Sequence, residues 1–438
     1  MLTIAYLANE FPSPVEPYVG DEIQELRRLG VRVIAGSVRK SASSWAAASD
    51  CAPQIVLRPP HAITLLRAMW LCVRRAKRIG PLISRVVFHG REGPIKRFKA
   101  LAHTGLGACY AVLLEGRGVD HIHVHHGYLG SWIAMVAARL LGVNFSMTLH
   151  GSDLLLHATY LDAKLEGCRF CLTVSEFNRN YIFERYLRVD AAKVIVARLG
   201  VEVSDCAVLT ARGLRTEGAP FRLLAVGRLH AVKDHAFLVR ACGQLHSRGV
   251  PFECSIAGEG PERRNLEALV RQCGLEERVR LLGHVPRELM DSYYDRADVV
   301  VLTSRSEGIP LVLMEAMARG KIVLAPAITG IPELVVAGKT GFLYAPGSLE
   351  GFVERLLFLR SLMLRSLMEA PDDPPDEAFV TGRSAGRELE GVRHAAREQV
   401  RNNFNRRKNL ESFGDLFIQR ITPQTESLPD ENFVLQQI

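Results

Sequence analysis

Short apolar runs alternate with amphipathic segments from the start of the chain. The apolar run at 2–8 (LTIAYLA) is followed by a segment with helical spacing at 19–30 and by a second apolar run at 31–36. Runs of this length are typical of buried strands, and the segments between them are typical of covering helices. This strand–helix rhythm predicts a parallel sheet with helices on both faces.

The rhythm restarts at Phe221, after a polar, glycine-rich stretch. We therefore predict two domains, residues 1–205 and 221–400, joined by a linker at 206–220. The predicted fold class is α/β, with two Rossmann-like, doubly wound parallel-sheet domains that face a central crevice.

The end of the chain departs from this rhythm. The Pro- and Asp-rich stretch at about 370–390 reads as an irregular surface insert. We expect residues 401–421 to form a closing helix that packs back on the N-terminal domain, and 422–438 to be a flexible tail.

Composition narrows the class of protein. The chain has 438 residues, 48% hydrophobic and 23% charged, which suits two globular cores. A net charge of +8 favours an anionic partner. The nine scattered cysteines argue against a disulfide framework, and the C-x-x-C pair Cys168 and Cys171 has no second pair, so we expect buried thiols. Without a long uncharged apolar run, we expect a cytoplasmic protein that can lie at the inner face of the plasma membrane.

The segment 61–107 is strongly basic, with ten Lys and Arg residues against the single acid Glu92. Apolar residues such as Trp70, Val73 and Phe88 are interleaved with these cations. One interpretation is an amphipathic surface for anionic lipid headgroups or a lipid-linked anionic substrate. The other is a solvated helical face packed on the sheet. Nucleic acid fits less well, because no aromatic stacking platform or recognition motif accompanies the charge.

Two cations follow the strand predicted at 221–226. Gly227 permits a tight turn there, and Arg228 and Lys233 come just before the next predicted helix. Ligands of doubly wound domains bind at the carboxyl ends of strands. Two cations at such a place suit a diphosphate and can offset the charge of a leaving group. The alternative is an ordinary pair of surface cations.

The stretch SEGIPLVLME at 306–315 places two carboxylates around a predicted helix start. Pro310 suits the first helical turn, so the next amides point out of a helix N-terminus, where an anion can bind. Glu307 precedes this helix and Glu315 lies about a turn inside it. A hydrolase acid–base pair must flank one bond at a set separation. We expect these carboxylates instead to bind two different hydroxyl-rich parts of one ligand.

Further candidates lie at other predicted strand ends. Gly258, in a G-x-G-P motif that is not a dinucleotide fingerprint, lets the backbone approach a ligand. His150 can hydrogen-bond a sugar hydroxyl, or can be satisfied by local backbone. The alternating His121, His123 and His125 invite a zinc interpretation, but no nearby carboxylate or cysteine completes a ligand set, so we predict no metal.

The combination of these motifs resembles glycosyltransferase family 4. The resemblance rests on Gly-Arg-Leu with a following Lys (227–233), G-E-G-P (258–261), the spacing of Glu307 and Glu315, HGSD (150–153) and TGIPELV (329–335). That family consists of retaining, nucleotide-sugar-dependent transferases with the GT-B fold. The opening stretch FPSPVEPYVGDEIQELRRLG looks most like transferases of colanic-acid-type and other exopolysaccharide assembly.

The resemblance implies a role for each candidate. Arg228 and Lys233 would hold the donor diphosphate, Glu315 the ribose, and Glu307 the donor sugar, with His150 near the reacting centre. Gly20, in the first strand-to-helix loop, would lie over the phosphates. The implied catalytic set is His150, Glu307, Arg228 and Lys233. The implied donor-binding set is Gly20, Asp153, Gly227, Gly258, Gly283, His284, Val285, Glu307, Gly308, Ile309, Pro310, Leu311 and Glu315, in which 283–285 line the base pocket.

The resemblance also implies the reaction. A hexose-type sugar would move with retention from a UDP- or GDP-linked donor, without cofactor or metal, to a lipid-linked oligosaccharide of a surface polysaccharide. The rival interpretations are a sugar-nucleotide epimerase or phosphorylase with the same crevice, and a non-catalytic nucleotide-sugar-binding subunit. The basic segment 61–107 speaks against a small soluble acceptor.

Overall fold

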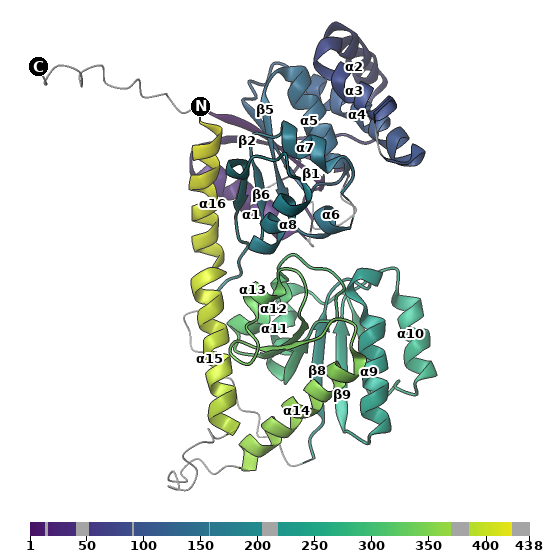
Figure 1. The fold of residues 1–438 in the computed structure, drawn as a ribbon, viewed down its shortest axis with the longest axis vertical. Helices are drawn as coiled ribbons and strands as arrows, with labels where there is room; N and C mark the ends of the chain where they lie inside the picture. The colour runs from purple at the N-terminus through teal and green to yellow at the C-terminus, as the bar shows by residue number, and fades with distance from the viewer. Residues whose placement is uncertain are drawn as a thin grey trace, which may run out of the picture.

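The computed structural model describes residues 1–13, 16–40, 52–89, 92–156, 158–203, 218–368 and 385–422. Figure 1 shows two α/β domains, one above the other, with two C-terminal helices running along one side of both. The predicted linker 206–220 lies mostly outside the described residues, as do most of the insert and all of the tail beyond Thr422.

The first domain is built on a parallel sheet in the order β3-β2-β1-β4-β5-β6-β7. Its strands are β1 (Thr3–Glu10), β2 (Arg32–Arg39), β3 (Ile55–Val56), β4 (His121–His125), β5 (Asn144–Leu149), β6 (Cys171–Thr173) and β7 (Val194–Val196). Its helices are α1 (Pro17–Arg28), α2 (Ala62–Arg74), α3 (Ala76–Val87), α4 (Pro94–Leu114), α5 (Leu129–Leu141), α6 (Ser152–Leu155), α7 (Leu161–Gly167) and α8 (Glu176–Arg185).

The second domain repeats this plan, with a parallel sheet in the order β10-β9-β8-β11-β12-β13. Its strands are β8 (Phe221–Val226), β9 (Phe252–Ala257), β10 (Val279–Gly283), β11 (Val299–Val301), β12 (Ile322–Pro326) and β13 (Phe342–Tyr344). Its helices are α9 (His235–Ser247), α10 (Arg263–Gln272), α11 (Arg287–Arg296), α12 (Leu311–Ala318), α13 (Ile331–Leu334) and α14 (Leu349–Met368), followed by α15 (Ala385–Asn403). Both sheets are doubly wound, as predicted.

The last helix, α16 (Arg406–Ile421), completes the core of the first domain. Its side chains Phe413 and Phe417 pack with Ile4 and Tyr6 of β1 and with Ile23 of α1. The sheet therefore has a helix-covered core on each face, because α4 and α5 cover the other face. This packing ties the end of the chain to its beginning.

Three details differ from the sequence prediction. The predicted insert extends too far, because α15 begins at Ala385. The closing helix begins at Arg406 rather than 401, after the cap formed by Asn405, whose side chain accepts from the Lys408 amide. Gly20 lies inside α1 and not in a loop, because Pro17 starts this helix three residues earlier.

Two other expectations concern cysteines and membrane spans. Cys168 and Cys171 are buried free thiols, and burial raises the pKa of both. Among the described residues, no helix combines the length and apolar character that crossing a membrane requires.

Candidate functional site

The loops at the carboxyl ends of the two sheets meet between the domains. The carbonyl oxygen of His150, directly after β5, lies so close to Gly308 that a Cβ atom at this glycine would be 1.8 Å from it. Only glycine fits there, because real Cβ atoms do not approach backbone so closely. Nearby, the Glu333 carboxylate of the second domain accepts from the amides of Glu176 and Phe177, at the N-terminus of α8.

The second domain contributes a paired cation and carboxylate to this junction. The Lys233 Nζ atom lies 2.5 Å from Glu307 Oε1, and both side chains are mostly buried. The Ser304 hydroxyl donates to the same oxygen at 2.5 Å. Arg228, in the loop after β8, is exposed. The sequence prediction assigned Lys233 and Glu307 to different parts of a ligand, and the structure joins them directly.

The start of α12 lies in the same loop system. Pro310 is the N-cap and Leu311 is the first helical residue, so the amides of Leu311 and Val312 have no acceptor within this eight-residue helix, whereas the Leu313 amide donates to the Pro310 carbonyl. Glu315 lies one turn inside, where Oε2 accepts from the Tyr294 hydroxyl at 2.8 Å. Burial and the Glu315 carboxylate hold the pKa of Tyr294 well above its usual value, so this hydroxyl stays a donor.

The glycine-rich loops of the second domain are packed against each other. A Cβ atom on Gly258 would lie 1.9 Å from the Gly227 carbonyl oxygen, so this glycine permits loop–loop packing rather than only approach to a ligand. Gly283 ends β10 and lies beside the Glu259 carboxylate. The following His284 is exposed and Val285 is half-buried. These residues form one continuous rim after β8, β9 and β10.

The first domain contributes a chain of hydrogen bonds that ends at His150. The Nε2 atom of this half-buried imidazole lies 2.9 Å from Nδ1 of His125, and His125 Nε2 lies 3.0 Å from Glu22 Oε2. The buried Tyr6 hydroxyl also donates to Glu22. Burial, followed by the nearby His126 and His125, lowers the pKa of His150 well below its usual value. His150 is therefore a neutral imidazole at the junction.

A second group of charges fixes the loop beside His150. His126 Nε2 lies 2.9 Å from Glu16 Oε1, and Nδ1 lies 3.6 Å from Asp153 Oδ2. Burial alone would lower the pKa of His126, but the two carboxylates outweigh it and raise the pKa to about 10. Burial would raise the pKa of Glu16, but His126, His125 and the cation of Arg228 together lower it. Glu16 is thus held ionised beside His126.

Asp153 has a different place from the one predicted for a donor-binding residue. Its side chain is fully buried, and its carboxylate accepts from the amides of Gly127, His150, Gly151 and Leu154. All of these partners belong to the protein backbone. Asp153 therefore holds the loop that carries His150, while Gly20 lies in the first turn of α1 and its place over the donor phosphates stays a prediction.

Several supporting residues were missing from the sequence prediction. Glu16, Glu22 and His126 had no predicted role, and His125 was considered only as a metal ligand. Lys164 is fully buried and its Nζ donates to three carbonyls, including those of Gly127 and Tyr128, at 2.8 and 2.9 Å. The HIHVHH run was the one signal for this network, because alternating polar side chains inside a strand require buried partners.

The metal interpretation of the histidines can be tested against their contacts. Glu22, His123 and His125 place ligand atoms within 4.8 Å of one another. The ring nitrogens of His123 lie 2.7 Å from Ser146 Oγ and 3.1 Å from Thr148 Oγ1. Those of His125 contact Glu22 and His150. Each nitrogen thus has a hydrogen-bond partner within the protein, and the absence of a resident metal stays a prediction.

The sequence of the second domain identifies its family. Residues 212–363 match the family model described as Glycosyl transferases group 1. The second domain is a group 1 glycosyl transferase domain. This match confirms the resemblance that the motifs indicated, and it covers every candidate residue of the donor side from Gly227 to Glu315.

The proteins similar to this chain include two that are named as biosynthesis glycosyltransferases. The chain is 37% identical over 170 residues to a putative colanic acid biosynthesis glycosyltransferase of Salmonella typhimurium, which is 37% of this chain and 41% of that protein. It is 34% identical over 175 residues to an amylovoran biosynthesis glycosyltransferase of Erwinia amylovora, which is 39% of this chain and 42% of that protein. These alignments thus span less than half of the relatives' length.

Solved structures resemble the whole two-domain chain. A glycosyltransferase from Rickettsia africae aligns with a TM-score of 0.64 at 19% identity, over 96% of this chain and 99% of that one. Sucrose-phosphate synthase from Thermosynechococcus elongatus aligns with a TM-score of 0.67 at 18% identity, over 96% of this chain and 99% of that one. HepE from Anabaena, in complex with UDP, aligns with a TM-score of 0.65 at 16% identity, over 96% of this chain and 100% of that one. The likeness confirms the predicted GT-B fold.

Proposed function

We propose that this protein is a retaining glycosyltransferase of exopolysaccharide assembly. It would move a hexose-type sugar from a UDP- or GDP-linked donor to a lipid-linked saccharide. The observation that carries the proposal is the arrangement at the domain junction. There the Lys233–Glu307 pair and the N-terminus of α12 lie in loops that contact the backbone of the neutral His150. The names of the relatives support the same class of reaction.

The donor would lie along the rim of the second domain. Arg228, Lys233 and the free amides of α12 are complementary to a diphosphate. Glu315 is held by Tyr294 in one orientation, which suits a carboxylate that accepts from two ribose hydroxyls. Glu307 would accept a hydrogen bond from a hydroxyl of the donor sugar, and the loop after β10 would contact the base. A neighbour of this fold was crystallised with UDP and with UDP and glucose.

Bond cleavage would depend on stabilising the departing diphosphate. As the sugar–oxygen bond breaks, negative charge would grow on the leaving group, and Arg228, Lys233 and the helix amides would stabilise it. Attack by the acceptor hydroxyl on the same face would retain the anomeric configuration. His150, as a neutral imidazole with one ring nitrogen free of a proton, would accept a hydrogen bond from the donor sugar and fix its orientation.

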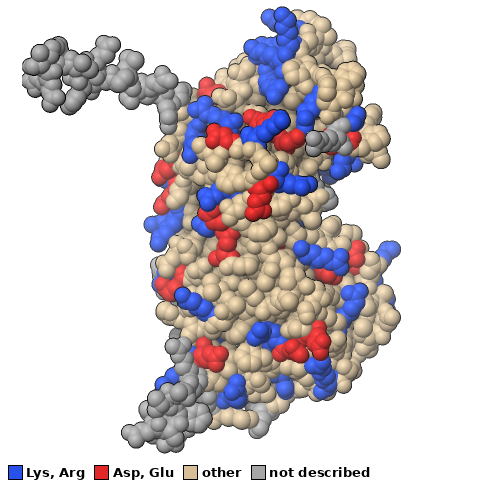
Figure 2. All heavy atoms as spheres, viewed as in Figure 1, with Lys and Arg blue, Asp and Glu red and all other residues tan. Residues whose placement is uncertain are grey.

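The basic segment supports a lipid-linked acceptor and contact with a membrane surface. Along α2, the apolar side chains Ile63, Leu66, Trp70 and Val73 recur at helical spacing and are 61–78% exposed. Figure 2 shows Lys and Arg gathered over this end of the first domain. Other parts of the segment pack inward, since Leu71, Ile79, Leu82 and Val86 are buried. The segment thus combines an exposed apolar stripe on α2 with side chains that pack in the core.

The proposal is tested by nucleotide binding followed by transfer. Thermal shift with UDP, GDP and ADP should single out one nucleotide, and Glu315→Ala should abolish that shift while the protein stays folded. With the matching nucleotide sugar, Arg228→Ala and Lys233→Ala should lower transfer at least about a hundredfold. Absence of any shift at millimolar nucleotide would contradict the proposal and favour a degenerate binding protein. Interconversion of the nucleotide sugar without transfer would favour an epimerase instead.

A further inference from the structure

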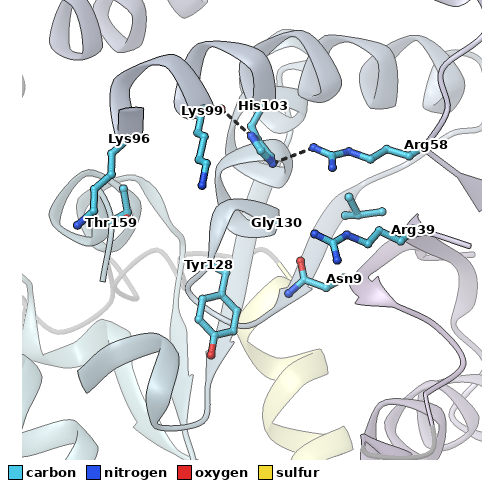
Figure 3. A pocket seen from close by; sticks show the side chains of 10 residues that line it. Asn9, Arg39, Arg58, Lys96, Lys99, His103, Tyr128, Gly130 and Thr159 are labelled. Carbon is cyan, nitrogen blue, oxygen red and sulfur yellow. Dashed lines mark hydrogen bonds between the residues drawn. The ribbon is translucent and has the colours of Figure 1, made fainter. Parts of the chain in front are cut away.

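A basic cavity of about 410 Å³ opens in the first domain, apart from the proposed donor groups. Figure 3 shows Lys96, Lys99 and His103 entering it from α4, while Arg39 and Arg58 enter from the opposite side. Arg39 ends β2, so the cavity lies at the carboxyl edge of the first sheet, where α/β domains bind ligands.

The charge of this cavity is one-sided. Four of its ten lining residues are Lys or Arg, a fifth is His103, and none of the ten is acidic. Lys96 and Lys99 lie in the first two turns of α4, whose first turn carries no acidic residue. Cations at a helix N-terminus oppose the helix dipole, so this arrangement costs stability unless an anion lies nearby. The cavity is therefore built for negative charge.

Hydrogen bonds hold two of these side chains toward the cavity. His103 Nδ1 lies 2.6 Å from the Lys99 carbonyl oxygen, to which it donates. Its Nε2 is then an acceptor, and the Arg58 guanidinium donates to it at 3.3 Å. Burial lowers the pKa of His103, and the Arg58 cation lowers it further, so the ring stays neutral at this contact. The remaining donors of Arg58 are left for a ligand.

The cavity lies between the domain junction and the exposed apolar side chains. Tyr128 lines it, and the Tyr128 hydroxyl lies 2.6 Å from Ser152 Oγ, two residues after His150. Ile95 and Phe98, 72% and 74% exposed, each precede one of the cavity lysines, so they occupy the adjacent face of α4. A ligand could thus have its anionic group in the cavity, its saccharide toward His150 and its apolar chain on α4.

We propose that this cavity binds the phosphate or diphosphate group that links the acceptor saccharide to its lipid. The proposal rests on the proposed function for the identity of the acceptor. Two or more phosphoryl oxygens would accept hydrogen bonds from Arg58, Lys96 and Lys99, because guanidinium and ammonium groups bind phosphates in this way. The anion would be bound as a fixed group and would not react.

The test measures binding of farnesyl diphosphate and of inorganic pyrophosphate, with the donor site saturated by whichever of UDP or GDP binds. Isothermal titration would compare the unmodified protein with Arg58→Ala, with the double variant Lys96→Ala/Lys99→Ala and with the control Lys408→Ala on α16. We expect the cavity variants to bind both probes at least about tenfold more weakly, and the control to bind them normally. Farnesyl diphosphate should bind more tightly than pyrophosphate, because its chain covers Ile95 and Phe98.

Three results would overturn the proposal. Cavity variants that bind both probes normally would exclude the cavity, and full competition by the nucleotide would assign the probes to the donor site. Equal affinity for pyrophosphate and farnesyl diphosphate would overturn the lipid-linked source. Nucleotide titration separates the two proposals, since failure of the unmodified protein to bind any nucleotide counts against the transferase alone.

Discussion

The Nδ1 atom of His125 lies 2.9 Å from the Nε2 atom of His150, and this contact joins a buried carboxylate to the domain junction. An ionised Glu22 only accepts, so it receives the Nε2 proton of His125. Nδ1 of a neutral His125 then accepts the Nε2 proton of His150. Nδ1 of His150 is left as an acceptor for a substrate hydroxyl, and Glu22 thereby sets the tautomer of a residue that it does not touch.

Glu22→Gln should disturb this tautomer while leaving nucleotide binding unchanged. The amide can donate to His125 and reverse the direction of both hydrogen bonds. We expect kcat of transfer to fall roughly tenfold to a hundredfold, with the nucleotide Kd unaltered. Glu25→Gln, one turn later on α1, is the matched control. Equal losses of kcat and nucleotide affinity in Glu22→Gln would indicate general damage to the fold and contradict a positioning role.

Glu307→Gln should separate diphosphate binding from sugar binding. The substitution removes the carboxylate that neutralises Lys233 at 2.5 Å and so frees this cation for phosphate. We expect the nucleoside diphosphate to bind as tightly as before or more tightly, while kcat with the nucleotide sugar falls about a hundredfold. Titration calorimetry and a transfer assay would measure the two effects. The exposed Glu276→Gln serves as control, and a parallel loss of nucleotide affinity would contradict the assignment of Glu307 to the sugar.

The fold could be predicted from the sequence because its signals are local. Most strands are short, largely apolar runs, and Phe221, where the rhythm restarts, is the first residue of β8. The errors lie where local signals conflict. The sequence predicts Gly20 in a loop, but Gly20 lies inside α1, which begins at Pro17. The Pro- and Asp-rich stretch hides the beginning of α15 at Ala385.

The site was predictable only as a set of strand ends. Lys233 and Glu307 were assigned to different parts of a ligand, and their direct pairing spans 74 positions. Glu22 and His125 are 103 positions apart, so nothing in the sequence shows that they touch. The basic cavity likewise collects residues from Asn9 to Thr159. Such relationships arise from packing between elements, which periodicity does not specify.

His126→Asn should change the pH dependence of stability. The backbone of His126 has a φ of 69°, which asparagine tolerates, so the substitution tests the side chain alone. The folded pKa of about 10 exceeds the unfolded value of about 6.5, so the stabilisation is fully present below pH 6.5 and is lost as the pH rises to about 10. Its maximum is on the order of 5 kcal/mol.

Urea unfolding of the unmodified protein and of His126→Asn, at pH values between 6 and 10, would measure this effect. The difference in unfolding free energy should be largest at pH 6 and shrink steadily toward pH 10. The exposed His246→Asn, on α9, should show no such trend. A difference that is constant over this range would mean that the imidazolium does not contribute through its charge.

Trp70→Glu/Val73→Glu should abolish binding to anionic membranes. Both side chains are more than 60% exposed on α2, and the Arg74 guanidinium lies 5.1 Å from the centre of the Trp70 ring. Membrane contact would bury these apolar groups and bring the cations to the headgroups, and two carboxylates would oppose both effects. We expect the double variant to bind phosphatidylglycerol vesicles at least about tenfold more weakly than the unmodified protein. Binding of the unmodified protein should weaken as the salt concentration rises.

The control is Leu187→Glu, since Leu187 is 87% exposed but lies outside this surface. Undiminished sedimentation of the double variant with the vesicles would show that α2 does not face the membrane.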